Sequence, residues 1–119
     1  MAAFRRAVTS GIDLAKRAEG HVRASDVLEI ANPASLGILC FRVNPKGCGL
    51  ADEALEAIND GVQSRIIETG TAMMSSTRLR GLYSLRLCIL NHATTWDDVR
   101  ETLEAVERFG LEAVSAESA

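Results

Sequence analysis

The chain has 119 residues and a mass of 12.8 kDa, which is enough for one compact domain, residues 1–119, and no more. With 47% hydrophobic and 24% charged residues it has the composition of a folded globular protein. The net charge of −3, from 13 basic and 16 acidic residues, gives no electrostatic basis for binding nucleic acid. No apolar run approaches the roughly 20 residues of a membrane span, and no secretory signal core follows the N-terminus. We therefore expect a cytoplasmic protein without nucleic-acid or membrane partners.

The first half of the chain predicts a helix followed by two strands. Apolar residues recur at helical spacing over residues 4–24, which predicts a helix that leads into the domain. Two β-branched, apolar runs follow at 27–30 and 36–43, and Asn32-Pro33 separates them. Residues 44–49 are rich in Pro and Gly and predict a loop.

The second half predicts a helix, two strands and a last helix. An apolar stripe predicts a helix over 51–68, with Gly70 as its stop. Residues 71–80 and 82–90 predict strands, the second with clean alternation. Thr95 is a candidate cap for a helix that ends at Gly110, and we expect residues 112–119 to be frayed.

The order α-β-β-α-β-β-α predicts an α+β two-layer sandwich. Short connections favour an antiparallel sheet of about four strands, with the helices packed on one face. Alternation then leaves the other face with aliphatic side chains, thiols and two arginines. Isolated monomers rarely expose such a face, so either the N-terminal helix covers it or another protein surface does.

Arg86 is the residue on this face that points most directly to a function. It stands between Leu85 and Leu87 in an apolar strand, where an arginine needs a partner. Its planar guanidinium suits a carboxylate or phosphate held by two hydrogen bonds, and an ordinary salt bridge to a nearby acidic residue is the plainer alternative.

No catalytic or metal-binding set is complete in this sequence. Cys40, Cys48 and Cys88 form neither a C-x-x-C pair nor an even disulfide framework. The spacing of Cys88 and His92 does not make a nucleophile and its base, and neither histidine has a ligand pattern around it. The turn at residues 46–49 lacks the spacing of a phosphate-binding loop.

Residues 75–99 resemble the C-terminal region of the pyridoxal-phosphate-dependent group II amino-acid decarboxylases, which include the aromatic-amino-acid and glutamate decarboxylases. The segments that carry the resemblance are GLYSLRLC at 81–88, NHATT at 91–95 and DDV at 97–99. LGILCFRV at 36–43 is similar to the family's first small-domain strand, and DEALEAIN at 52–59 to its middle helix.

The resemblance implies a small C-terminal domain that closes the active site against a large, pyridoxal-phosphate-binding domain of a homodimeric carboxy-lyase. It implies a substrate-binding role for Arg86, near the substrate carboxylate. The cofactor lysine of the family belongs to the large domain, and neither Lys16 nor Lys46 stands in its sequence setting. We therefore expect this chain alone to hold no catalytic residue, to bind no cofactor and to be inactive.

Two alternatives remain at the level of sequence. One is a stand-alone α+β regulatory domain that binds a small ligand, for which the turn at residues 46–49 is the candidate site. The other is the small subunit of a split decarboxylase, whose large domain is a separate polypeptide.

Overall fold

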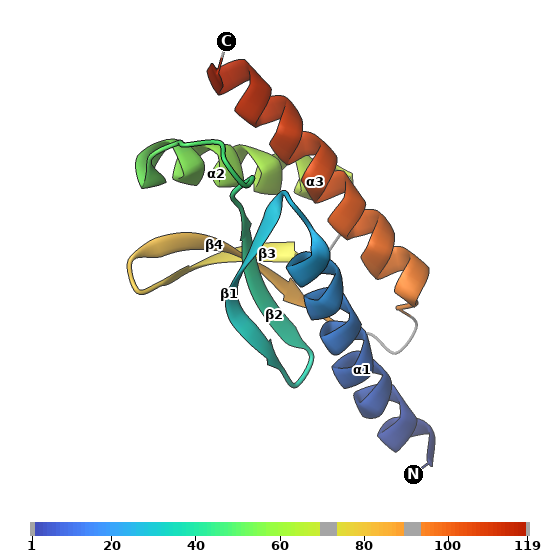
Figure 1. Cartoon of the computed structure of the whole chain (residues 1–119). Helices are drawn as coiled ribbons and strands as arrows, with labels where there is room; N and C mark the ends of the chain where they lie inside the picture. The colour runs from blue at the N-terminus through green and yellow to red at the C-terminus, as the bar shows by residue number, and fades with distance from the viewer. Residues whose placement is uncertain (1, 70–73, 90–93, 119) are drawn as a thin grey trace.

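The computed structural model describes the backbone of residues 2–69, 74–89 and 94–118, and the side chains of residues 11–69, 74–89 and 94–116. Its elements follow the predicted order and are α1 (Ala2–Ala24), β1 (Leu28–Ser35), β2 (Ile38–Val43), α2 (Asp52–Glu68), β3 (Met74–Leu79), β4 (Leu82–Cys88) and α3 (Trp96–Ser118) (Figure 1).

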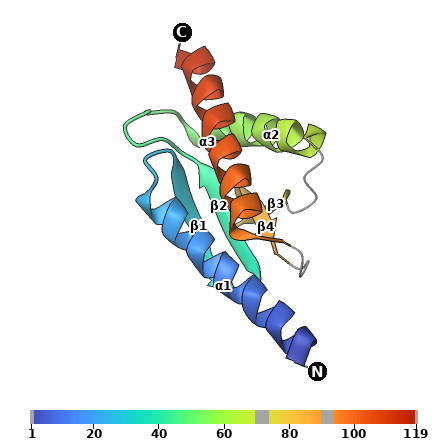
Figure 2. The ribbon, with the colours of Figure 1, turned by 90° about the vertical axis from the view of Figure 1, so that its right-hand side faces the viewer.

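The four strands form one antiparallel sheet in the order β1-β2-β4-β3. Two hairpins, β1–β2 and β3–β4, therefore meet through their second strands in the middle of the sheet. In Figure 2, α1 and α3 lie in front of the strands, with α2 across the end of the sheet. The predicted α+β sandwich with its helices on one face is confirmed.

One hydrophobic core joins all three helices to one face of the sheet. The central strands contribute Leu39 and Phe41 from β2 and Leu85 and Leu87 from β4, each fully buried. The helices contribute Leu14, Ala15, Ala18, Val22, Ile58, Val62, Ile66, Val99, Leu103, Val106 and Phe109. Since the buried residues of α1 belong to this same core, the idea that the N-terminal helix covers the opposite face of the sheet is wrong.

The first strand is longer and less regular than the sequence predicts. β1 continues through Asn32 and Pro33, where we expected a break, and its register with β2 shifts on both sides of Asn32. β1 is an edge strand, and Pro33 lies at its register irregularity between Asn32 and Ser35, which is where a sheet tolerates proline. The actual turn is Leu36-Gly37, between the paired residues Ser35 and Ile38.

The last helix passes the residue at which the sequence predicts its end. Its start is as expected, because the Thr95 hydroxyl accepts from the Asp98 N–H and the Asp98 carboxylate accepts from the Thr95 N–H. The helix then runs through Gly110 to Ser118, where we expected a frayed tail. A Cβ at Gly110 would lie 2.7 Å from Val43 Cγ1, so this glycine serves close packing. The predicted stop of α2 at Gly70 lies outside the described residues.

Candidate functional site

The face of the sheet that the helices leave uncovered carries Arg86. We call this the open face, and define it by Ile38, Cys40 and Arg42 of β2, Ser84, Arg86 and Cys88 of β4, and Ser75 and Thr77 of β3. Paired residues of antiparallel strands project on the same side, so the register places Arg86 between Cys40 and Ser75.

Arg86 is half-buried and has no carboxylate partner among the described residues. Ion pairs or ring contacts hold Arg17, Arg23, Arg42, Arg65, Arg78, Arg100 and Arg108. Arg80 also lacks such a contact, but it is exposed at a hairpin tip. The ordinary salt bridge that the sequence left open for Arg86 is therefore absent from the described part of the chain.

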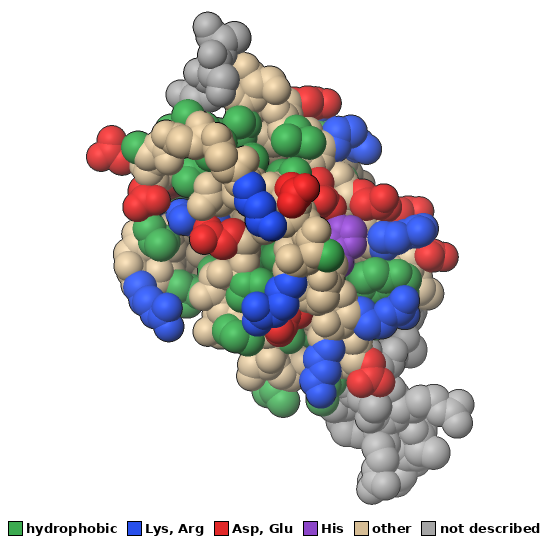
Figure 3. All heavy atoms as spheres, viewed as in Figure 1, with side chains coloured by type: hydrophobic (Ala, Val, Ile, Leu, Met, Phe, Trp, Pro, Cys, Tyr) green, Lys and Arg blue, Asp and Glu red, His purple; other side chains and the backbone are tan. Residues whose placement is uncertain are grey.

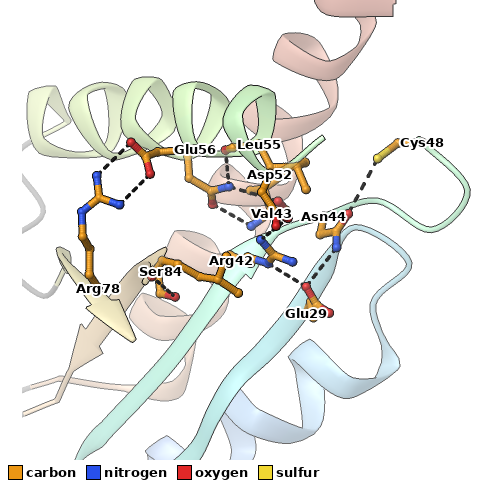
Figure 4. Close-up of polar contacts among 12 residues, drawn as sticks. Glu29, Arg42, Val43, Asn44, Cys48, Asp52, Leu55, Glu56, Arg78 and Ser84 are labelled. Carbon is orange, nitrogen blue, oxygen red and sulfur yellow. Dashed lines mark hydrogen bonds and ion pairs between the residues drawn. The ribbon is translucent and has the colours of Figure 1, made fainter. Parts of the chain in front are cut away.

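Arg42, the second arginine of the open face, is occupied. Its Nε donates to Glu29 Oε2 at 2.7 Å, and its Nη1 lies 3.5 Å from Asp52 Oδ1 (Figure 4). Burial opposes ionisation of Glu29, but hydrogen bonds from Asn44 and Arg42 outweigh it and hold the pKa of this carboxyl below its ordinary value. Arg42 thus fastens β1 to β2 and to the start of α2.

The two thiols of the open face flank Arg86 and are free. Cys40 is buried and Cys88 is half-buried. Burial raises the pKa of the Cys40 thiol, and the positive charge of Arg86 opposes part of that rise. Neither thiol has a base beside it among the described residues, and His92 lies outside them, so the pairing of Cys88 with His92 stays untested.

The turn at residues 46–49 lines a cavity of about 550 Å³ between the loop, the end of α1 and the start of β1. The side chain of Lys46 is 71% exposed, and its Nζ pairs with Asp26 Oδ1 at 3.4 Å. Lys16 is exposed on α1. A lysine that forms a Schiff base must be held as the neutral amine, usually by burial. Neither lysine meets this condition, so the described residues do not fit a pyridoxal phosphate site.

Sequence reasoning missed a polar cluster that joins the end of α1 to α3. Glu107 accepts from Ser25 Oγ at 2.9 Å and contacts His21 Nε2 at 2.6 Å. Ser25 Oγ in turn accepts from the N–H groups of Val27 and Leu28. The carboxylate stands between the hydroxyl and the imidazole, so the histidine cannot take the serine proton. The cluster therefore ties elements together and does not form a nucleophile. No short sequence motif predicts this cluster, because Ser25 and Glu107 are 82 positions apart in the chain.

Charges of both signs are interleaved on the surface in Figure 3. Among the described residues, no group of three or more His, Cys, Asp or Glu side chains could hold a metal ion. Within the same ranges, no helix is both long and apolar enough to cross a bilayer.

Comparison with known proteins gives consistent relatives. The chain is 32% identical over 112 residues to an aromatic-L-amino-acid decarboxylase of Bacillus atrophaeus, covering 94% of this chain and 23% of that protein. Its fold matches that of the Oryza sativa TDC crystallised with PLP, with a TM-score of 0.84, 23% identity, and coverage of 95% of this chain and 24% of that one. For Catharanthus roseus tryptophan decarboxylase in complex with L-tryptophan, the TM-score is 0.77 at 26% identity, covering 90% and 22%. No family model matches the chain.

These matches define a class. The fold is that of a small segment of pyridoxal-phosphate-dependent decarboxylases, and the chain spans about a quarter of the length of the relatives it matches. The resemblance to the group II amino-acid decarboxylases is confirmed.

Proposed function

We propose that this chain is the C-terminal domain of a pyridoxal-phosphate-dependent amino-acid decarboxylase, and that Arg86 binds the α-carboxylate of the substrate. The observation that carries the proposal is the half-buried guanidinium of Arg86 on the open face, with no carboxylate partner among the described residues. An unpaired arginine in an apolar strand is a cost to folding, which a bound anion offsets.

Arg86 would orient the substrate by two parallel hydrogen bonds to the carboxylate. Pyridoxal phosphate, when bound, provides the electron sink for the electron pair that decarboxylation leaves behind. The carboxylate loses its negative charge as carbon dioxide departs. The bond to Arg86 is therefore strongest with the bound substrate, and we expect its loss to raise KM more than it lowers kcat.

The remainder of the active site would come from a large domain, either in the same polypeptide or in a partner chain, within a homodimer. Two observations support the need for a separate large domain. The chain spans only about a quarter of its relatives, and its two lysines are exposed. The chain alone would then release no carbon dioxide from any amino acid and form no covalent adduct with pyridoxal phosphate.

The test is Arg86→Gln in the intact enzyme, assayed with L-tryptophan, L-tyrosine and L-2,4-diaminobutyrate. We expect KM for the accepted amino acid to rise about 10- to 100-fold, the equivalent of one lost charge-assisted hydrogen-bonding pair. Inhibition by the amine product should be unchanged, because the amine has no carboxylate for Arg86 to bind.

Arg80→Gln is the matched control, since Arg80 also lacks an ion pair among the described residues but is exposed at the tip of the β3–β4 hairpin. It should keep wild-type kinetics. If KM is unchanged in Arg86→Gln, or if the affinities for amine and amino acid fall together, Arg86 does not bind the carboxylate. Decarboxylation by the 119-residue chain alone would refute the proposal as a whole.

A second candidate function rests on the cavity beside residues 46–49. We propose as the alternative a regulatory domain that binds a small amino acid in this cavity of about 550 Å³. It predicts that millimolar free amino acid raises the melting temperature of the isolated chain by mass action, whereas the decarboxylase proposal predicts no shift.

A further inference from the structure

The tip of the β1–β2 hairpin presents an exposed leucine in a backbone conformation that leucine disfavours. Leu36 has a φ of +56°, in the left-handed region, and its exposed fraction is 73%. Hairpin turns with a positive φ at the first central residue favour glycine there, because a Cβ crowds the backbone. The conformation and the exposure of Leu36 are both unfavourable for the folded chain. No contact among the described residues buries its side chain to offset them.

The turn itself does not require leucine, and its neighbour shows what the turn does require. A Cβ at Gly37 would lie 2.7 Å from the carbonyl oxygen of Ile89, so this position must be glycine. Gly37 also accepts a hydrogen bond from the Ile89 N–H at 2.8 Å. A Cβ at Gly11 of α1 would meet the same Ile89 oxygen at 2.7 Å. The backbone of the turn therefore packs closely against both β4 and α1, which sets the position of Leu36.

Leu36 adjoins the part of the open face that holds Arg86. The next residue of the hairpin after Gly37 is Ile38, which pairs with Cys88, and Cys40 pairs with Arg86. Ile38 and Cys88 are only half-buried. Leu36, Ile38 and Cys88 thus form an apolar border at the hairpin end of the open face, beside the arginine.

We propose that Leu36 is the anchor by which this domain docks onto the cofactor-binding remainder of the decarboxylase, inserted into an apolar pocket of that part. The inference rests on the proposed function, which supplies the occupant: about three quarters of the relatives' length lies outside this chain. An apolar side chain on a fixed turn makes an effective anchor, because its burial is favourable and the turn backbone loses little conformational entropy.

The experiment is Leu36→Gly in the intact enzyme, followed by the rate of iodoacetamide labelling at Cys88, read peptide by peptide. Removing the anchor should undock the open face and raise the labelling rate of Cys88 about tenfold, as expected for loss of an interface hot spot. The rate at Cys48, in the loop after β2, should not change. Leu36→Asn, which also tolerates the left-handed region, should behave like Leu36→Gly, and Leu36→Met should behave like wild type.

Arg80→Gly is the matched control. Arg80 is the other described non-glycine residue with a positive φ, at +54°, and it lies in the turn at the opposite end of the sheet. Both glycine substitutions relieve backbone strain, but Leu36→Gly alone also removes the anchor, so it alone should raise labelling at Cys88.

Equal labelling of Cys88 in Leu36→Gly and Arg80→Gly overturns the proposal. So does conversion of a dimer to a monomer by Leu36→Gly without a change at Cys88, since the anchor would then contact a second copy. The two proposals fail separately. If the intact enzyme is active but Leu36→Gly does not change the labelling of Cys88, only the docking proposal is refuted. If the intact protein decarboxylates none of the tested amino acids but Leu36→Gly raises the labelling of Cys88, the docking proposal stands and the proposed function is refuted.

Discussion

The side chain of Asn59 satisfies both backbone groups of Val43. Its Oδ1 accepts from the Val43 N–H at 2.7 Å, and its Nδ2 donates to the Val43 carbonyl at 3.1 Å and to the Leu55 carbonyl at 2.7 Å. Asn59 is fully buried in α2, and Val43 is the last residue of β2. The amide thus continues the sheet's hydrogen bonding at the point where the strand ends, and fixes α2 to the sheet.

Asn59→Ala should destabilise the fold by about 2–4 kcal/mol, because two buried backbone groups of Val43 lose their partners at once. Urea denaturation of the variant measures this as a lower midpoint at an unchanged slope. Ser64→Ala is the control on the same helix, because Ser64 is exposed and its hydroxyl only bonds to the preceding turn. A loss no larger than that of Ser64→Ala would contradict the role given to Asn59.

Gly110→Ala should destabilise the fold by about 1–3 kcal/mol, although alanine favours helix, because the new Cβ would lie 2.7 and 2.9 Å from the two methyl groups of Val43. Gly61→Ala in α2 is the matched control. Its Cβ meets nothing within 4 Å, so it should stabilise by about 0.5–1 kcal/mol. In a double-mutant cycle, Val43→Ala should remove most of the cost of Gly110→Ala. Stabilisation by Gly110→Ala in the wild-type background would show that this contact is not tight.

Glu19 should make stability depend on pH in the acid range. A hydrogen bond of 2.7 Å from the Ala34 N–H, and then one from Arg23, hold the pKa of Glu19 below its ordinary value. A lowered pKa in the folded state contributes stability above the unfolded value of about 4.3, and this contribution is lost as the pH falls through the folded value. Between about pH 5 and pH 3, Glu19→Gln should therefore lose less stability than wild type. Glu101→Gln, an exposed position on α3, should follow the wild-type curve.

Arg86→Gln should move the titration of Cys40 upward. Burial raises the pKa of this thiol and Arg86 opposes the rise, so removal of the positive charge should raise the pKa further. The midpoint of the pH profile of Cys40 alkylation reports it, independently of how accessible the thiol is. Arg80→Gln should leave the midpoint in place. An unchanged midpoint in Arg86→Gln would mean that the charge of Arg86 does not reach Cys40.

The alternation of the two central strands was enough to predict the candidate site. Because side chains alternate across a strand, Leu85 and Leu87 in the core require Arg86 on the opposite face, and the structure places it there. The absence of a carboxylate beside Arg86 could not be predicted, because an ion pair depends on residues distant in sequence. Arg42 looks equivalent in sequence, yet it is occupied by Glu29, 13 residues away.

The sequence by itself determined the order of the elements, the buried face of the two central strands and the Thr95 cap, because periodicity and capping act within a few residues. Only the tertiary structure decided the roles of residues that depend on contacts between distant segments. The role of Gly110 depends on Val43, the role of Gly37 on Ile89, and the end of α1 on Glu107. It also decided that the helices leave the open face uncovered, because all three pack on the one face of the sheet that carries the large apolar side chains.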